Sequence, residues 1–179
     1  DNVRDWLLIS CFTAQRISDF SRFGKDMIIE VKDQKLISFK QTKGQKEIVI
    51  PLLPEVQQVL NKRGGEFPRK ISDQRFNEYV KELCKIIGFT KEIEGSVVKN
   101  IGGDKDKKHR KVKGSYPKYM LVSSHIGRRS FATNFYGKIP TPLLMSATGH
   151  TTEKQFLEYI KIAEVDSALE LAKLYLELK

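Results

Sequence analysis

Cysteine is scarce in this sequence: Cys11 and Cys84 are the only two, and no Cys-x-x-Cys pair is present. This scarcity excludes a disulfide framework and favours a reducing compartment such as the cytoplasm. No apolar run approaches the roughly 20 residues that a membrane-spanning helix needs. No basic segment followed by an apolar stretch opens the chain as in a signal peptide. A Walker phosphate-binding loop and an H-E-x-x-H motif are also absent.

Positive charge is present in excess. The 179 residues include 32 lysines and arginines against 22 acidic residues, which gives a net charge of +10. With 40% hydrophobic and 30% charged residues, the composition is typical of a globular domain that is neither disordered nor membrane-embedded. A domain this basic is expected to bind a polyanion, either a nucleic acid or an anionic membrane surface.

Hydrophobic periodicity predicts a mainly α chain with a small antiparallel three-stranded β-sheet, an α+β fold. A turn around Lys43-Gly44-Gln45 joins the last two strands. Residues 91–119 carry a glycine pair and many cations, and we expect a loop or an irregular hairpin there. The predicted strands are 27–31, 35–41 and 46–52, and the predicted helices are 2–14, 53–62, 73–87, 124–136, 141–148, 152–160 and 164–178.

The most basic stretch, residues 105–113, indicates contact with phosphate backbones. A solvated loop is the ordinary alternative, and the stretch alone does not distinguish DNA from RNA or acidic lipid. Binding to a membrane surface is disfavoured because the cations gather in a loop and not along a basic amphipathic helix. The candidate phosphate-contacting residues are Lys105, Lys107, Lys108, Arg110, Lys111 and Lys113.

Two pairs of polar residues have spacings that could build a site. His125 and Arg128 lie three residues apart at the start of a predicted helix, so both face one point. Gly149-His150 is followed nine residues later by Tyr159. Each feature has an ordinary alternative when taken alone: a surface arginine at a helix start, a capping or core histidine, and a tyrosine with a solvated hydroxyl.

Two further cations have ordinary alternatives as well. Arg16 follows the first helix and precedes Asp19 by three residues, which alone suggests a local ion pair of little energy. Lys43 lies in a β-turn, where a lysine can serve solubility.

Taken together in chain order, these residues resemble the catalytic domain of the tyrosine recombinases, the phage-integrase family. TAQRISDF (13–20) resembles the first arginine box with its downstream acidic residue, and KQTKGQKEIVIPL (40–52) resembles the hairpin of the catalytic lysine. SSHIGRRSFATNF (123–135) resembles the H-x-x-R helix, and MSATGHTTEKQFLEYI (145–160) resembles the G-H box with its nucleophilic tyrosine. The resemblance covers residues 5 to about 162 and is strongest to integrases of bacterial conjugative transposons and related mobile elements.

The resemblance implies site-specific DNA recombination or integration without a metal or any other cofactor. Tyr159 would attack the scissile phosphate and form a 3′-phosphotyrosine, from which another strand's 5′-hydroxyl religates the DNA. Arg16 and Arg128 would stabilise the charge on the non-bridging oxygens, since a guanidinium is always charged and forks onto two oxygens.

The remaining roles follow from the same resemblance. His125 would act as general base toward the tyrosine or donate to the phosphate, and His150 would donate to a non-bridging oxygen. Lys43 would protonate the leaving 5′-oxygen as general acid. Asp19 would lie behind the site and orient neighbouring cations.

The family also implies partners and domains. We expect double-stranded DNA as the partner, a tetramer on DNA, a monomer in isolation, and a bacterial cytoplasmic location. The sequence starts at Asp1 inside a predicted helix, so residues 1–179 are expected to be a catalytic domain that lacks the family's N-terminal core-binding domain. The C-terminal helix, residues 163–179, either packs on its own domain or docks on a neighbouring protomer.

One box departs from the family pattern, and two alternative functions stay open. The first box reads Thr13-Ala14-Gln15-Arg16, where the family usually has Thr-Gly-Leu-Arg, so Gln15 replaces an apolar residue. A type IB topoisomerase shares this residue set and chemistry. A catalytically silent DNA-binding domain is the other alternative, although such a domain would not need Tyr159 together with both arginines.

Overall fold

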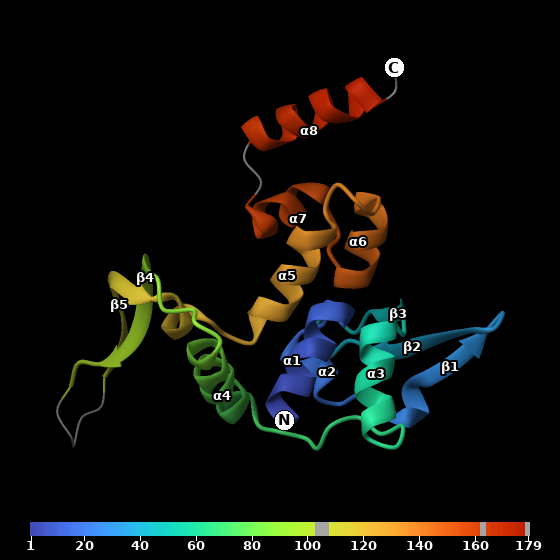
Figure 1. The fold of residues 1–179 in the computed structure, drawn as a ribbon, viewed down its shortest axis with the longest axis horizontal. Coiled ribbons are helices and arrows are strands. Elements are labelled where there is room, and N and C mark those ends of the chain that lie inside the picture. Colours follow the sequence, from blue (N-terminus) through green and yellow to red (C-terminus); the bar gives the residue numbers. More distant parts are fainter. Residues whose placement is uncertain (103–107, 162–163, 178–179) are drawn as a thin grey trace.

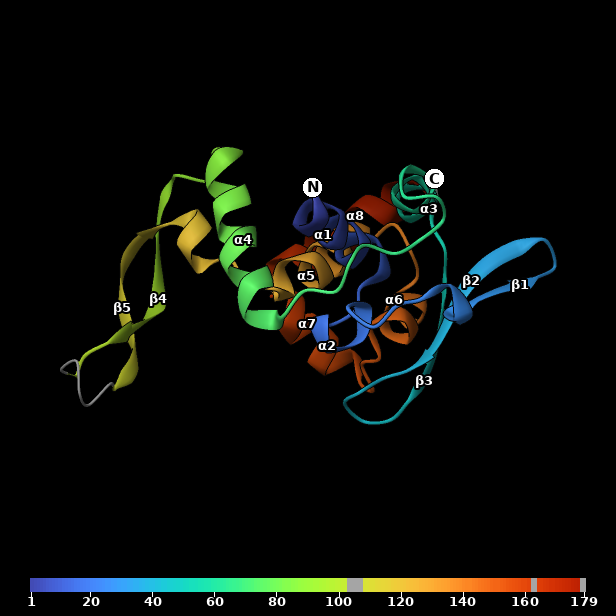
Figure 2. The same ribbon diagram turned by 90° about the horizontal axis from the view of Figure 1, so that it is seen from below.

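The computed structural model describes residues 1–102, 108–161 and 164–177. Helices form the body, and two separate antiparallel sheets flank it (Figures 1 and 2). One sheet has the strand order β1-β2-β3, and the other pairs β4 with β5. The strands are β1 (Ile28–Val31), β2 (Gln34–Lys40), β3 (Glu47–Pro51), β4 (Glu92–Asn100) and β5 (His109–Pro117). The helices are α1 (Asn2–Thr13), α2 (Ile17–Phe20), α3 (Pro54–Lys62), α4 (Asp73–Ile86), α5 (His125–Phe135), α6 (Thr141–Thr148), α7 (Glu153–Ile160) and α8 (Glu164–Glu177), with 3₁₀ turns η1 (Lys25–Met27) and η2 (Lys118–Leu121).

The larger hydrophobic core lies between α1, α2, α3, α4 and the three-stranded sheet. Aromatic side chains dominate it: Trp6, Phe20 and Phe76 are fully buried, and Phe20 meets the other two at ring centroid distances of 5.7 and 5.5 Å. The Trp6 indole also donates to the backbone carbonyl of Arg69 at 3.0 Å, so its polar atom is satisfied. This core holds the first helix against the sheet.

A second, smaller core joins α5, α6 and α7. Phe131, Leu144 and Phe156 fill it, and Ala14, the residue after α1, packs into it as well. Ala14 has a left-handed backbone with φ 61°, which ends α1 at Thr13 and not at residue 14 as the periodicity predicts. The first arginine box therefore starts at the point where the two cores meet.

Helices α1 and α5 cross closely at Gly127. A Cβ atom there would lie 2.8 Å from the backbone carbonyl carbon of Ser10, so a glycine is required for the observed separation. The crossing brings the residue that follows, Arg128, against the end of α1.

The three-stranded sheet confirms the sequence prediction, because the strands alternate as expected: Ile48 and Ile50 are buried, and Val49 between them is exposed. For residues 91–119 the sequence predicted a loop or an irregular hairpin, and the structure has the more regular form. Two nine-residue strands, 92–100 and 109–117, pair antiparallel, and Gly95 faces Gly114. Gly95 leaves room for Leu121, since a Cβ would lie 2.7 Å from a methyl carbon of that side chain. Because these exposed strands carry few apolar residues, the sequence shows no clear alternation of apolar and polar positions there.

Helix α8 projects from the body of the ribbon in Figure 1, and its Leu171 and Leu174 line a hollow together with Tyr136 and Ile139. Its apolar side chains Val165, Leu169, Leu171 and Leu176 are each about two-thirds exposed. Within the described ranges, no helix combines the length and the apolar character that crossing a lipid bilayer requires.

Candidate functional site

Arg128 lies at the centre of the candidate site. Although it carries a charge, its side chain is 1% exposed. Nη1 donates a hydrogen bond of 2.9 Å to the backbone carbonyl of Ala14, which the left-handed turn after α1 presents toward α5. The close crossing at Gly127 and this turn therefore fix the guanidinium against the first arginine box.

Arg16 lies close enough to Arg128 for the two charges to interact. Its backbone is extended and starts α2. Burial is the main cause that lowers the pKa of Arg128 to about 10, and the positive charge of Arg16 lowers it further. The Tyr159 side chain and the Asp19 carboxylate oppose this shift. Two like charges held together in a buried site favour an anion between them.

His150 follows the left-handed Gly149 that ends α6. Burial lowers the pKa of His150 to about 4, with further lowering by the charges of Arg128 and Arg16. Its Nδ1 lies 2.8 Å from the Thr148 hydroxyl, which donates its own proton to the Leu144 carbonyl at 2.7 Å. Because the bond to Leu144 uses the single proton of the hydroxyl, this arrangement favours the tautomer in which His150 donates from Nδ1 and Nε2 carries the lone pair of the neutral ring.

Tyr159 lies among these cations. Its ring centroid is 5.2 Å from that of His150, 5.8 Å from Cζ of Arg128 and 5.3 Å from Cζ of Arg129. Within the described ranges, neither its buried hydroxyl nor Nη2 of Arg128 makes a well-aligned hydrogen bond, although the Tyr159 side chain lies close enough to act as an acceptor that raises the pKa of Arg128. Buried polar groups are seldom left unsatisfied, and these two lie at the same place.

His125, the first residue of α5, stands at the mouth of the site. It lines a hollow of about 540 Å³ together with Tyr159, Arg129 and Lys118. Partial burial lowers the pKa of His125, and the charges of Arg128, Arg16 and Arg129 add to the effect. The imidazole is therefore biased toward the neutral form, which a general base requires.

Lys43 is exposed on the turn between β2 and β3. Asp19 anchors this turn, because its Oδ1 accepts from the Thr42 backbone N–H at 2.7 Å. The same oxygen lies 3.4 Å from Arg22, so the carboxylate contacts one cation and the turn. The sequence assigned Asp19 to the cations alone, and the contact with the turn is new.

Comparisons with known proteins place the fold. No protein-family model and no curated protein matches the sequence. The XerH site-specific recombinase, in a post-cleavage complex with palindromic difH substrate, matches with a TM-score of 0.64 at 16% identity, over 98% of this chain and 45% of that one. The chain has the fold of a tyrosine recombinase catalytic domain.

Two other solved structures agree. The Tn1549 transposon integrase with transposon right end DNA matches at a TM-score of 0.58 and 13% identity, over 97% of this chain and 59% of that one. A lambda integrase dimer bound to a COC′ core site matches with a TM-score of 0.60 at 16% identity, over 89% of this chain and 42% of that one. The chain thus spans about half the length of these structures, and the recombinase fold is what the likeness shows.

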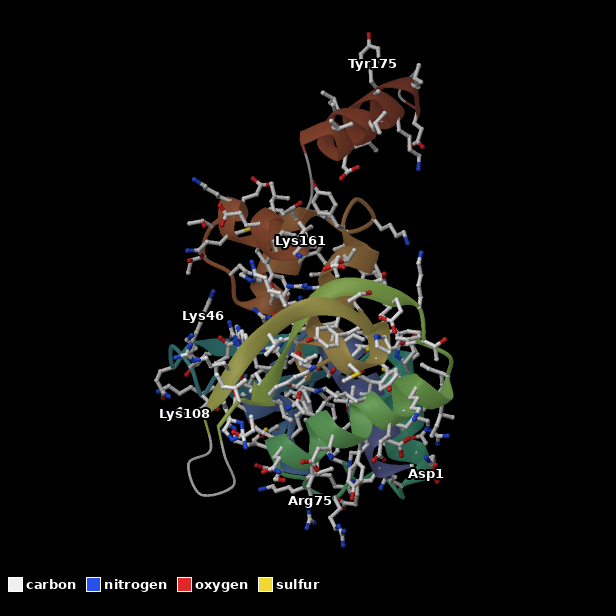
Figure 3. All side chains as sticks on the ribbon, turned by 90° about the vertical axis from the view of Figure 1, so that its left-hand side faces the viewer. Asp1, Lys46, Arg75, Lys108, Lys161 and Tyr175 are labelled. Carbon is white, nitrogen blue, oxygen red and sulfur yellow. The ribbon has the colours of Figure 1, made fainter. Side chains whose placement is uncertain are left out.

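Four of the predicted phosphate-contacting residues, Lys108, Arg110, Lys111 and Lys113, lie on or beside the β4–β5 hairpin of this recombinase fold. Lys105 and Lys107 lie outside the described residues. Arg110 shares a face with Val112, whereas Lys111 and Lys113 share the opposite face. Lys108 precedes the strand, and Figure 3 shows it at the far end of the hairpin.

For three residues at the site, Arg129, Gln15 and Gln41, the sequence predicted no role there. Arg129 contacts the Tyr159 ring, and only its position after Arg128 could have drawn attention to it. Gln15 and Gln41 are buried side by side between the boxes, with exposed fractions of 0% and 3%. The sequence marks Gln15 as a departure from the family pattern, and the structure shows that this polar residue is fully enclosed.

Proposed function

We propose that this chain is the catalytic domain of a site-specific DNA recombinase or integrase, which cleaves and rejoins double-stranded DNA through a 3′-phosphotyrosine at Tyr159. The observation that carries the proposal is the pair of adjacent buried groups without a well-aligned hydrogen bond, the Tyr159 hydroxyl and Nη2 of Arg128, beside the charge of Arg16. A scissile phosphate between them would give the guanidinium an acceptor and the phenol an electrophile.

The cleavage step forms one bond and breaks one. The Tyr159 oxygen bonds to phosphorus while the bond from phosphorus to the 5′-oxygen breaks. The phenol proton passes to the neutral imidazole of His125, and Lys43 gives a proton to the leaving 5′-oxygen. The reverse attack by a 5′-hydroxyl restores a phosphodiester, so no nucleotide cofactor is consumed.

Charge stabilisation falls to the cations around the phosphate. The phosphorane-like transition state gathers negative charge on its non-bridging oxygens, and Arg16 and Arg128 are held beside that position. Preorganised donors of this kind contribute roughly 10²- to 10³-fold each to a rate. The incoming phosphate raises the pKa of His150 from about 4, because it supplies an anion beside two arginines. The protonated ring then donates from Nε2.

The β4–β5 hairpin is proposed to contact the DNA backbone. Figures 2 and 3 show its far end and the β2–β3 turn directed to the same side of the molecule, with Lys108 and Lys46 labelled at that edge in Figure 3. A duplex on this side would meet Lys43 and the hairpin cations Lys111 and Lys113 together. Contacts of this kind position a duplex without reading its sequence.

Assembly belongs to the proposal as well. Helix α8 exposes Val165, Leu169, Leu171 and Leu176, which would be covered by docking on a neighbouring protomer of a tetramer on DNA. We further propose that a core-binding domain completes the grip on the duplex, as the family resemblance implies.

The test is covalent trapping on DNA. A pool of duplexes with a randomised centre and a nick in one strand lets the short 5′-hydroxyl fragment diffuse away after cleavage, so an SDS-resistant adduct accumulates. Tyr159→Phe should form no adduct, and Tyr79→Phe, an exposed tyrosine on α4, should form as much as the wild type. An adduct with Tyr159→Phe would overturn the assignment. Binding without any adduct would favour a silent DNA-binding domain, and efficient relaxation of any plasmid would favour a topoisomerase.

A further inference from the structure

Gln15 is a fully buried amide between the backbone segments that carry the site. Its Nε2 donates to the Thr13 carbonyl and to the Ala147 carbonyl, both at 2.7 Å. Thr13 ends α1, and Ala147 lies three residues before His150. One side chain thereby ties the first arginine box to the G-H box, which lies 132 positions further along the chain.

Gln41 extends this connection to the turn of Lys43. Its Nε2 donates to Oε1 of Gln15 at 3.3 Å, and its backbone N–H donates to the Lys46 carbonyl at 2.9 Å, which closes the turn. The Gln41 amide also lies against Gly149: a Cβ there would come within 2.9 Å of Oε1 of Gln41. Gly149 has φ 72°, so the backbone conformation also favours glycine.

We propose that Gln15 and Gln41 are positioning residues for the reaction. This Gln15–Gln41 amide pair holds the turn of Lys43 in a fixed position relative to Arg16 and His150. This inference rests on the proposed function. Neither glutamine reaches the hollow at Tyr159, so the pair acts through the groups that flank it. Arg16 follows Gln15 directly, His150 follows Gly149, and Lys43 comes two residues after Gln41.

Hydrogen bonding explains why amides serve this purpose. A buried amide is costly unless its hydrogen bonds are made, and those bonds have fixed directions. Apolar side chains of similar size would fill the space and allow neighbouring segments to slide. The polar pair therefore specifies one relative placement of three loops that share no regular secondary structure. Misplacement of a catalytic group by about 1 Å can cost roughly 10²-fold in rate.

The leaving group provides a selective test. Gln41→Met keeps the length and volume of the side chain and removes the amide. It should lower cleavage of an ordinary substrate roughly 10- to 100-fold, as loss of an orienting partner does. On a substrate with sulfur in place of the scissile 5′-oxygen, a thiolate leaves without a proton, so most of the loss should disappear. Gln15→Met should show the larger loss of the two and retain part of it on the sulfur substrate, because it also loosens the G-H box.

Controls separate this inference from the proposed function. Lys43→Ala should show the same selectivity for the sulfur substrate, and Gln74→Met, on the exposed side of α4, should match the wild type on both. If Lys43→Ala loses equally on both substrates, the general-acid role fails. Suppose that Lys43→Ala lowers the cleavage rate mainly on the ordinary substrate. The positioning role then fails if Gln41→Met and Gln15→Met each lower the rate equally on both substrates, or leave it unchanged. A thermal unfolding midpoint equal to that of the wild type would show that each variant is folded.

Discussion

The two hairpins that carry cations differ in how the rest of the molecule holds them. The β2–β3 turn is anchored where β2 enters it: Thr42 donates to Asp19, Arg22 donates to the Lys40 carbonyl at 2.8 Å, and Gln41 lies against Gly149. The β4–β5 hairpin is held at its base, where the backbone of Lys118 donates to Lys91 at 2.9 Å. Along β5, Tyr116 bonds to Val112 within the same strand.

The difference separates two uses of a lysine on a hairpin. An anchored turn can deliver one ammonium to one oxygen, as proton transfer requires. A projecting hairpin offers several charges to a phosphate backbone, for which position matters less. Substitutions in the site, at the anchor of the turn and on the hairpin distinguish these two uses.

Arg128→Ala should lower cleavage roughly 10²- to 10³-fold, because it removes the buried donor between Tyr159 and Arg16. Arg75→Ala, on α4, is the matched control and should be unchanged. The loss should shrink on a substrate whose scissile phosphate has a methyl group in place of one non-bridging oxygen, because that phosphate is uncharged. An equal loss on both substrates would show that Arg128 does not act on phosphate charge.

Asp19→Ala should disturb the anchored turn. The part-buried Thr42 N–H loses its charged acceptor, and a hydrogen bond to a charged group contributes about 1.5–3 kcal/mol. Cleavage should fall roughly 10- to 100-fold on an ordinary substrate, and less when the leaving group is sulfur. Asp26→Ala, on η1, provides the control. Unchanged cleavage by Asp19→Ala would mean that Lys43 does not depend on its anchor.

Lys111→Ala and Lys113→Ala should weaken DNA binding with little effect on the rate at saturating DNA. Each phosphate contact contributes about 0.9 to the slope of log affinity against log salt concentration. The slope should fall by about that amount for each variant, measured by fluorescence anisotropy over a salt series. A lowered cleavage rate at saturation would instead assign the hairpin to the chemistry.

Acid should destabilise the free protein modestly. The pKa of His150 is lowered to about 4 in the folded state from an ordinary value of 6.5, so the unfolded chain binds more protons between these values. Stability is therefore complete above pH 6.5 and falls as pH drops toward 4. His125, whose pKa is also lowered, adds to the trend. Urea unfolding at several pH values should show a shallower fall for His150→Gln, and an unchanged fall would contradict the shift.

The sequence predicted the longer helices and the three-stranded sheet well, because buried residues such as Ile48 and Ile50 alternate on regular faces. It did not predict the four-residue helix α2. The β4–β5 hairpin was less evident, since lysines occupy positions where strands usually carry apolar residues. The Gln15–Gln41 amide pair could not be foreseen, because its contacts join segments that approach only in the tertiary structure. The departure at Gln15 was visible in the sequence, and its partners were not.

The central claim is that Tyr159 forms the covalent bond to DNA. The most direct measurement is mass spectrometry of the trapped adduct after digestion with nuclease and protease. Cleavage by Tyr159 should give a nucleotide joined through its 3′-phosphate to the peptide that contains Tyr159. A nucleotide on any other residue, or one joined through a 5′-phosphate, would contradict it.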